Sequence, residues 1–212
     1  MKKAIIVFVV LAVTAIRPAY AAMIDDFNGG VMTVNADASN VYQQYLAAFG
    51  GGRTVNITKT GPLEATAEVN QGTYSHSSDG LTSASSTISW IDESGVDLTS
   101  GNINNVFLLA ILSIDQGKID LTLSITDVLG AYDSFSLSGA GVGVQNIAFS
   151  LFSNVDFLQV KEVSLLIAGE MASDLEIDSL MTSNTVPAPS VLVLLSVGLL
   201  VSGFNRRRLS LS

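Results

Sequence analysis

The sequence of 212 residues contains no cysteine, and it has only one histidine, one tryptophan and four prolines. Without cysteine there are no disulfides, no thiolate metal ligands and no cysteine nucleophile, so the fold must be stabilised by its core. The sequence also lacks the spacing of an EF-hand, a phosphate-binding P-loop and a dinucleotide-binding glycine fingerprint. These absences exclude several common kinds of cofactor site.

Basic residues are scarce in the middle of the chain. All nineteen acidic residues lie between residues 25 and 178, and the basic residues in the same stretch are Arg53, Lys59, Lys118 and Lys161. Four positive charges against nineteen negative charges leave a net charge of −15 there. Such a surface repels phosphate backbones, which argues against nucleic acid and anionic lipid as partners. Acidic loops suit calcium instead, because calcium prefers hard oxygen ligands.

The amino-terminal segment is typical of a secretory signal peptide. Two lysines are followed by an apolar stretch at residues 4–16, and Ala19 and Ala21 place small side chains at the two positions that a signal peptidase reads. We therefore predict that residues 1–21 are a signal peptide, that cleavage follows Ala21, and that the chain is exported across the inner membrane.

The carboxy-terminal segment has three parts in a fixed order. The first part is formed by Val186, Pro187, Ala188, Pro189 and Ser190. Residues 191–204 follow without a charge and are almost wholly apolar, and Arg206, Arg207 and Arg208 end the series. The prolines hold the backbone extended, so the apolar stretch can begin cleanly as a transmembrane helix. The arginines then stop translocation and stay on the cytoplasmic side.

These three parts together resemble the PEP-CTERM sorting signal, in which Val-Pro-Glu-Pro is followed by a hydrophobic helix and a basic cluster. Here Ala188 occupies the position of the usual glutamate. The resemblance implies a bacterium with a two-membrane envelope that makes extracellular polysaccharide, and an exosortase that processes the tail. It also implies a single-pass intermediate in the inner membrane before the protein reaches the cell surface. The alternative is an ordinary single-pass anchor with a proline-rich hinge.

Between the two signals the sequence favours one β-domain. This stretch is long enough for one domain with a proper core and too short for two comfortable ones. It is also rich in Ser, Thr, Gly and aliphatic residues, which favour strands and tight turns. We predict a domain over residues 22–181, a polar spacer over 182–185 and the sorting signal over 186–208.

Alternation of apolar and polar residues predicts the strands. Apolar and polar residues alternate over residues 119–126 and again over residues 134–138. Residues 127–130 between them include an aspartate and a glycine, which favour a turn, so the segment is predicted to form a hairpin. The continuous apolar run at residues 106–112 predicts a strand covered on both faces. Further strands are expected at residues 54–58, 63–69, 87–91, 163–168 and 175–180. About eight short strands with tight turns predict an all-β fold, an antiparallel β-sandwich.

One helix is also predicted, between residues 40 and 50. A Ser-Asn pair can cap it, Val41, Tyr45 and Phe49 recur at four-residue spacing, and Gly50 can end it. The run of three glycines that begins at Gly50 leaves a loop between strands as the alternative.

Several motifs between the two signals follow a recognisable order. They are Ile24-Asp25-Asp26-Phe27, Gly51-Gly52-Arg53, Gly72-Thr73-Tyr74, the strand around Trp90, Asp156-Phe157, Val160-Lys161-Glu162-Val163 and Leu175-Glu176-Ile177-Asp178. This order resembles the galactose-binding-like jelly roll, a group that includes carbohydrate-binding modules. The resemblance implies a jelly-roll sandwich and a role in binding.

The same resemblance implies a calcium ion held between the first strand and the last. Asp25 or Asp26 together with Asp178 occupy those positions. Calcium is accordingly the cofactor that we predict, with these aspartates as its ligands. The alternative is that they are solvated acids of turns and strand edges, as aspartates commonly are.

Candidate catalytic residues have no convincing setting. His76 lies in a serine-rich stretch, where a Ser-His-Asp apposition arises easily, and we interpret it as a surface histidine. The acidic residues considered for a glycosidase pair are Asp25, Asp26, Glu93, Asp97 and Glu170. No two of them occur in a recognisable arrangement. The sequence therefore predicts no catalytic residue.

Aromatic side chains that could stack on sugar rings are few. They are Tyr42, Tyr45, Tyr74, Trp90 and Tyr132. Trp90 shares its side of a strand with Ile88, so we expect it to pack in the core.

The sequence predicts an exported, non-enzymatic protein of the cell surface or extracellular matrix. It would be sorted through the PEP-CTERM signal and linked to exopolysaccharide or a biofilm. Its partners would be exosortase, signal peptidase and the inner membrane during export, and extracellular polysaccharide afterwards. The alternative is a secreted carbohydrate-binding module or a weak carbohydrate-active enzyme.

Overall fold

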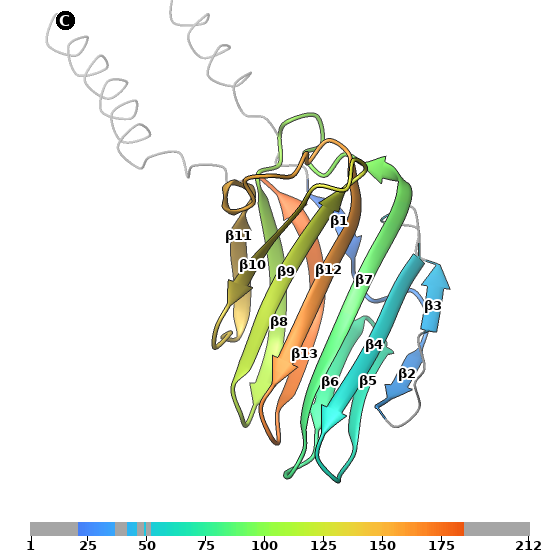
Figure 1. Cartoon of the computed structure of the whole chain (residues 1–212), viewed down its shortest axis with the longest axis vertical. Helices are drawn as coiled ribbons and strands as arrows, with labels where there is room; N and C mark the ends of the chain where they lie inside the picture. Colours follow the sequence, from blue (N-terminus) through green and yellow to red (C-terminus); the bar gives the residue numbers. More distant parts are fainter. Residues whose placement is uncertain (1–20, 37–41, 46–48, 50–51, 185–212) are drawn as a thin grey trace, which may run out of the picture.

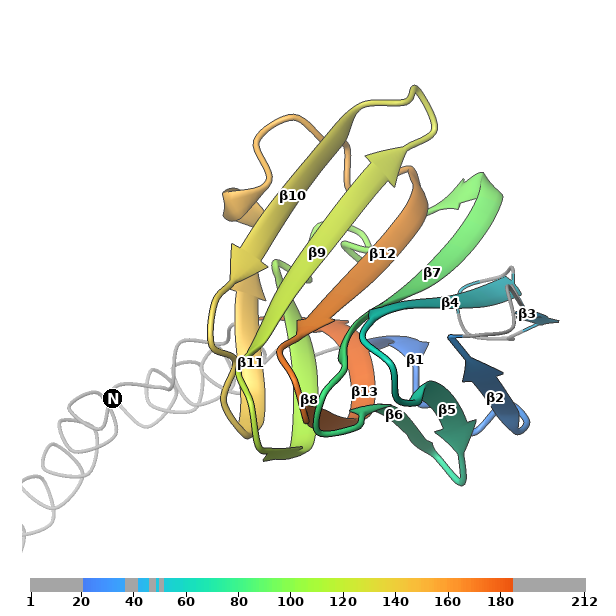
Figure 2. The ribbon, with the colours of Figure 1, turned by 60° about the horizontal axis from the view of Figure 1, so that its bottom comes forward.

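The computed structural model describes residues 21–36, 42–45, 49 and 52–184. Within these ranges the chain forms thirteen strands and one short 3-10 helix, and the strands make two antiparallel sheets that face each other (Figures 1 and 2). Apart from Ala21, the predicted signal peptide and sorting tail lie outside these residues. No helix within the described ranges is long and apolar enough to cross a membrane.

The first sheet has seven strands. In spatial order they are β11 (Gly143–Ala148), β8 (Val106–Asp115), β13 (Asp174–Ser183), β6 (Thr73–Ser78), β5 (Ala65–Asn70) and β2 (Met32–Asn35), and β1 (Ala22–Asp25) pairs with β13. Strand β13 pairs along its first half with β6 and along its last half with β1, while β8 runs along its other side. The predicted first and last strands are therefore neighbours.

The second sheet has six strands. In spatial order they are β10 (Tyr132–Leu137), β9 (Ile119–Asp127), β12 (Val160–Gly169), β7 (Ser83–Val96), β4 (Gly52–Thr60) and β3 (Tyr42–Tyr45). The 3-10 helix η1 (Phe149–Leu151) lies in the connection between β11 and β12. Every connection from β6 to β9, and again from β10 to β13, passes from one sheet to the other. This confirms the predicted all-β, antiparallel β-sandwich of jelly-roll type.

Period-two alternation explains how the core is built. In β9 the apolar side chains of Ile119, Leu121, Leu123 and Ile125 are buried, whereas the residues between them are not fully buried. Strand β10 pairs with β9 from Tyr132 opposite Thr126 onward, which confirms the predicted hairpin. The core lies between the two sheets and draws on both of them.

The apolar run in β8 differs from the expectation of cover on both faces. Phe107, Leu109 and Ile111 are buried in the core, but Leu112 is 48% exposed. Strand β8 therefore has one buried face, and its outward side chains add apolar surface to the seven-stranded sheet.

The helix predicted between residues 40 and 50 is wrong. Residues Tyr42–Tyr45 form β3, which pairs antiparallel with β4 and places Tyr42 opposite Val55. The four-residue spacing of large side chains was coincidental, because pairing with β4 satisfies the backbone groups of this segment. The segment therefore contains a strand, which neither the predicted helix nor the alternative of a loop anticipated.

The end of the domain also differs from the prediction. Strand β13 continues to Ser183, so Thr182 and Ser183 belong to the sheet and not to a spacer. The hydroxyl of Thr182 is buried, donates to the carbonyl of Leu98 and accepts from the side chain of Asn104. Ala22 lies opposite Thr182, so the chain enters and leaves the sandwich at the same place.

Candidate functional site

The outward side of the six-stranded sheet is lined by hydroxyl groups. In β7 the inward positions fill the core, whereas Ser83, Ser85, Thr87 and Ser89 alternate with them on the outer side. The same alternation places serine and threonine outward on β4, β9 and β10. We call the outer side of β10, β9, β12, β7 and β4 the hydroxyl face.

Strand register aligns these hydroxyls into a row. Thr54, Ser89, Ser164, Ser124 and Ser134 stand opposite one another on five adjacent strands. Neighbouring strands are about 4.8 Å apart, so this row extends for about 19 Å. A continuous line of five hydroxyls therefore crosses the sheet.

A second row runs parallel to the first. It consists of Asn56, Thr87, Leu166, Thr122 and Ser136. The two rows are two residues apart along each strand, which corresponds to about 6.7 Å. Leu166 is the one apolar member of this row, and it stands between Thr87 and Thr122.

Side-chain hydrogen bonds within the face use part of the capacity of the rows. The Ser89 hydroxyl donates to the Ser164 hydroxyl at 3.1 Å, and Thr122 and Ser136 share a hydrogen bond of 2.9 Å. Each hydroxyl has one donor and two acceptor lone pairs, so capacity is left over for water or a ligand.

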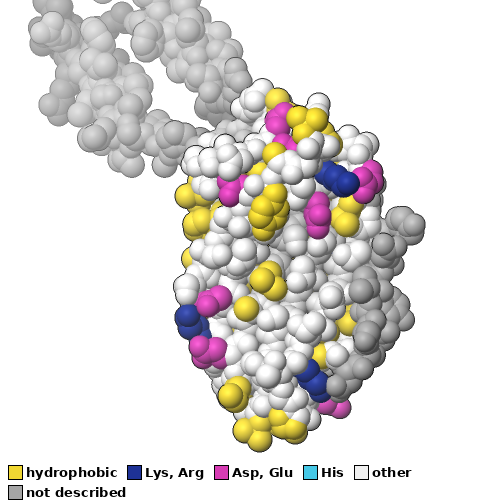
Figure 3. Space-filling view, in the orientation of Figure 1, with side chains coloured by type: hydrophobic (Ala, Val, Ile, Leu, Met, Phe, Trp, Pro, Cys, Tyr) yellow, Lys and Arg dark blue, Asp and Glu magenta, His cyan; other side chains and the backbone are white. Residues whose placement is uncertain are grey.

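The hydroxyl face carries little charge. Figure 3 shows that its middle is mostly uncharged and that most charged side chains stand toward the ends and margins. Four of the charged residues form two ion pairs, Lys118 with Asp120 at 3.2 Å and Lys161 with Glu93 at 2.6 Å. A ligand that lies along the middle of this face therefore meets hydroxyls and not ionised groups.

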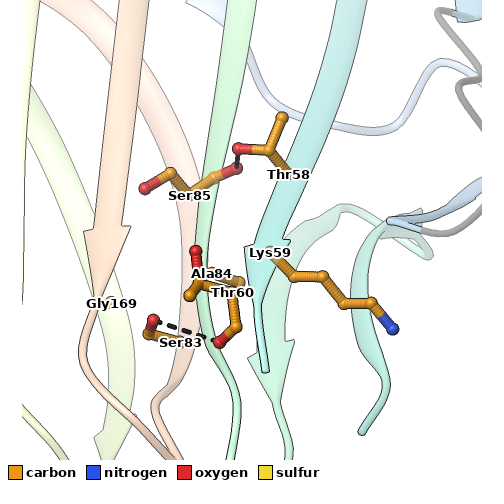
Figure 4. A pocket seen from close by; sticks show the side chains of 7 residues that line it. All are labelled: Thr58, Lys59, Thr60, Ser83, Ala84, Ser85 and Gly169. Atoms are coloured by element: carbon orange, nitrogen blue, oxygen red, sulfur yellow. Dashed lines mark hydrogen bonds between the residues drawn. The ribbon is translucent and has the colours of Figure 1, made fainter. Parts of the chain in front are cut away.

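A shallow pocket of about 70 Å³ lies at one end of the face (Figure 4). Its lining includes Thr58 and Thr60 of β4 and Ser83 and Ser85 of β7, and Lys59 points away to donate to the carbonyl of Leu63. Enclosed sites for small molecules have volumes of about 300 to 1,000 Å³. This pocket is too small to enclose a sugar, so a ligand would lie across the face.

The aromatic residues considered for sugar stacking are mostly in the core. Trp90 and Tyr74 are buried, which confirms the expectation for Trp90. Tyr132 is 58% exposed at the β10 edge of the hydroxyl face, where its hydroxyl lies 3.2 Å from that of Ser124. The side chains of Tyr42 and Tyr45 lie outside the described part of the structure.

Asp25, a predicted calcium ligand, lies in a buried network. Its Oδ2 accepts hydrogen bonds from Nη1 of Arg53 at 2.6 Å and from Nε1 of Trp90 at 2.7 Å. Its Oδ1 accepts from the backbone N–H of Phe27, whose ring lies 5.4 Å from the Arg53 guanidinium carbon. Arg53 also donates to the carbonyl of Gly29. Both oxygens of Asp25 thus have protein partners.

Asp26 and Asp178 lie elsewhere. Asp26 is near the surface and accepts hydrogen bonds from the side chain and backbone of Asn28, which lower its pKa. Asp178 is exposed on β13 and accepts from the hydroxyl of Ser179. Within the described ranges no three acidic, histidine or cysteine residues come together as a metal-binding group. Calcium binding stays a prediction that a measurement has to decide.

His76 is buried between the sheets, so the expectation of a surface histidine is wrong. Its Nδ1 lies 2.8 Å from the hydroxyl of Ser86, which also accepts a hydrogen bond of 2.6 Å from Tyr74. Burial lowers the pKa of His76 to about 4, against a smaller opposing effect of Asp174. A neutral, enclosed imidazole at this place packs and orients its neighbours, and it has no access to a substrate.

The acidic residues weighed for a glycosidase pair are scattered. Glu93 is paired with Lys161 at the rim, and Asp97 accepts hydrogen bonds from Thr99 and Gly101 in its own loop. Glu170 follows β12 in an exposed turn. Asp25 is held by Arg53. A glycosidase needs two carboxyl groups that face one bond, and the described positions of these residues do not supply such a pair.

Two features of the site were missed at the sequence level. Arg53 has the same two-residue spacing from Val55 as Val55 has from Ile57, so the alternation that placed the two aliphatic residues inward also indicates a buried arginine. The rows of the hydroxyl face depend on the register between strands that are distant in sequence, and alternation within one strand does not determine that register.

Comparison with known proteins finds similarity among solved structures alone. No protein-family model matches the sequence, and no curated protein matches it. A family 11 carbohydrate-binding module of the cellulosomal cellulase Lic26A-Cel5E of Clostridium thermocellum is 12% identical, with a TM-score of 0.40 over 78% of this chain and 95% of that one. TmCBM61 in complex with beta-1,4-galactotriose is 13% identical, with a TM-score of 0.36 over 78% and 87%.

An exo-beta-agarase is also similar, at 13% identity and a TM-score of 0.46 over 80% of this chain and 26% of that one. Each of these similarities has a TM-score below 0.5, and none identifies a ligand for this chain.

Proposed function

We propose that this chain is an exported, non-enzymatic protein that binds a neutral, extended polysaccharide across the hydroxyl face. The observation that carries the proposal is the row of five aligned hydroxyls from Thr54 to Ser134. A polysaccharide presents its own hydroxyls at regular intervals, so it can exchange hydrogen bonds with such a row along its length. The pocket at this face is too small to enclose a sugar, so the face favours a long polysaccharide that lies across it over a single small sugar.

Charge decides between neutral and anionic polysaccharides. The net charge of −15 between the two signals repels an acidic polymer at long range, and the middle of the hydroxyl face offers it no cation. A neutral polymer incurs neither penalty. Each hydrogen bond to a hydroxyl replaces one to water and contributes only about 0.5 to 1.5 kcal/mol, so affinity depends on engaging many residues of the row together.

Binding is favoured over hydrolysis by the positions of the groups that hydrolysis would need. His76 is enclosed in the core, and Asp25 is neutralised by Arg53. The two rows themselves consist of Leu166 and neutral donors and acceptors. Neutral hydroxyl and amide groups hold a ligand but do not transfer protons to a leaving group at neutral pH.

The location of the protein is proposed from its two terminal segments. Signal peptidase would remove residues 1–21, and an exosortase would process the tail that contains Pro187, Pro189 and Arg206 to Arg208. The domain would then reach the cell surface or the extracellular matrix, where exopolysaccharide is present. Binding and sorting together describe a matrix-associated protein of a biofilm.

Affinity gel electrophoresis of residues 22–185 tests the binding proposal. Neutral β-glucan or galactan in the gel should retard the protein, whereas alginate should not. Ser164→Lys places a long side chain in the middle of the row and should weaken retardation at least tenfold. Ser113→Lys, the same substitution on the other sheet, is the matched control and should bind as the unsubstituted domain does.

Two outcomes would contradict the proposal. Migration that is unaffected by every neutral polysaccharide would remove the binding function and leave a structural surface protein. Release of new reducing ends from a polysaccharide that binds would show an enzyme instead.

A further inference from the structure

Strand β11 forms one edge of the seven-stranded sheet. Among the described strands it pairs with β8 alone, antiparallel, from Gly143 opposite Ile111 to Ala148 opposite Val106. Every second residue of such a strand directs its backbone N–H and C=O away from its neighbour. Figure 2 shows β11 at the side of the sandwich, and no other described strand pairs with its outer edge. An open edge of this kind is a template for another strand.

The usual protection of an edge strand is missing here. Natural edges are commonly blocked by lysine, by proline or by an inward charge, but residues 134–155 contain no charged residue and no proline. In a chain with nineteen acidic residues, an uncharged stretch of this length is a distinct feature. Strand β10, the corresponding edge of the other sheet, carries Asp133. The unprotected edge is therefore β11.

The side chains at this edge are apolar and uncovered. Val142 is 61% exposed and Val144 is 57% exposed, and Leu112 is exposed on the adjacent strand β8. A methyl group added at Gly141 or Gly143 would meet no described atom within 4 Å. Nothing among the described residues covers the edge, and its exposed surface would gain from being removed from water.

We propose that a second copy of this chain occupies the edge, with the two β11 strands antiparallel and the seven-stranded sheets joined into one. Charge restricts where two copies of this chain can meet. Two copies with a net charge of −15 each repel one another over most of their surface. They can meet without opposing like charges along the uncharged segment of residues 134–155. A two-fold axis across β11 lets each copy present the same residues to the other, which gives a closed dimer.

The geometry supplies both specificity and attraction. Backbone hydrogen bonds between the two strands fix their direction, and the exposed valines fix the partner because they become buried together. The hydroxyl face belongs to the other sheet and stays free in the dimer. Dimerisation therefore does not depend on the ligand. A dimer with two hydroxyl faces would bind two segments of a polymer at once.

Sedimentation equilibrium of residues 22–185, a segment that contains all strands of both sheets, tests the proposal. The apparent mass should rise from one chain to two as the protein concentration increases from micromolar to millimolar. Val144→Lys should keep the mass at one chain over the same range. Asn146→Lys, which places a lysine on the same strand, should do so as well, in case one substitution alone disturbs the fold.

Val31→Lys is the matched control. Val31 is 69% exposed next to β2, at the opposite edge of the same sheet, so the substitution removes the same side chain and adds the same charge there. This variant should dimerise like the unsubstituted domain. An unsubstituted domain that sediments as one chain at every concentration would overturn the proposal, and so would a dimer that is unaffected by both lysines on β11.

Discussion

Arg53 and Trp90 stand directly opposite each other on β4 and β7, and both donate to the same carboxylate oxygen of Asp25. All three side chains are almost completely buried. The network joins β1 to two strands of the other sheet, so it connects the first strand after the predicted cleavage site to the core. The buried charges of Arg53 and Asp25 compensate each other, so removing one of the two leaves the other buried without a partner.

Removing one member of this pair should be strongly destabilising. Arg53→Met leaves the carboxylate of Asp25 buried without its cation, and we expect a loss of about 3 to 5 kcal/mol in the free energy of unfolding. Urea unfolding followed by Trp90 fluorescence measures this. Lys118→Met, which removes the cation of the exposed pair with Asp120, is the control and should leave the urea midpoint unchanged. A small effect of Arg53→Met would mean that water reaches Asp25.

The core prediction is tested at β9. Leu123 is 1% exposed between the sheets, so Leu123→Ala should cost about 2 to 5 kcal/mol of stability. Ser124→Ala, at the next residue on the hydroxyl face, should change stability by less than about half a kcal/mol. Equal effects of the two substitutions in urea unfolding would contradict the assigned faces of this strand.

Stability should depend on pH through His76. Because burial lowers its pKa in the folded state to about 4 from an ordinary value of 6.5, the unfolded chain binds a proton more readily. Stability from this group is complete above pH 6.5 and is lost as the pH falls toward 4. At pH 5 the loss should be about 2 kcal/mol relative to neutral pH. Urea unfolding at both pH values measures it, and His76→Gln should remove this part of the pH dependence.

Calcium binding is decided by thermal melting of residues 22–185. If an ion is held by Asp26 or Asp25 with Asp178, calcium at 100 times its dissociation constant should add about 2.7 kcal/mol of stability. Asp178→Asn should remove most of that gain, and magnesium should replace calcium poorly. A chelator that leaves the melting temperature unchanged at constant ionic strength would show that these aspartates are solvated or, for Asp25, committed to Arg53.

Processing is tested by the intact mass of the protein released from cells. We expect a chain that begins at Ala22 and lacks Arg206, Arg207 and Arg208, because both terminal segments carry sorting features. A released species that retains the three arginines would count against cleavage of the tail. Replacing them by neutral residues should weaken retention of the intermediate in the membrane.

The sandwich could be predicted because most of its strands alternate strictly. Strand β9 shows this clearly, since Leu121 and Leu123 are buried and Thr122 is not. Strand β6 was missed because its inward side chains include His76 and Ser78, which are polar and therefore give no apolar alternation. Their partners, Ser86 for His76 and Ser173 for Ser78, lie on other segments of the chain. Strand β11 was missed because glycine and valine at its start show no contrast between its two faces.

The candidate site could be predicted only in part. Exposure of serine and threonine follows from alternation, but the alignment of Ser89 with Ser164 joins residues that are 75 positions apart. Such pairings depend on register, which a single strand does not encode. The role of Asp25 was likewise hidden, because its partner Arg53 is on a different strand in the other sheet.

The position of β13 also determines when this domain can fold. It is the last strand of the sandwich in chain order, yet it lies in the interior of its sheet, between β8 on one side and β6 and β1 on the other. A chain that emerges amino terminus first can form the hairpin of β9 and β10, but neither half of the seven-stranded sheet can join the other until residue 183 is available. We therefore expect the seven-stranded sheet to close late in folding, after β13 has become available to pair with both halves.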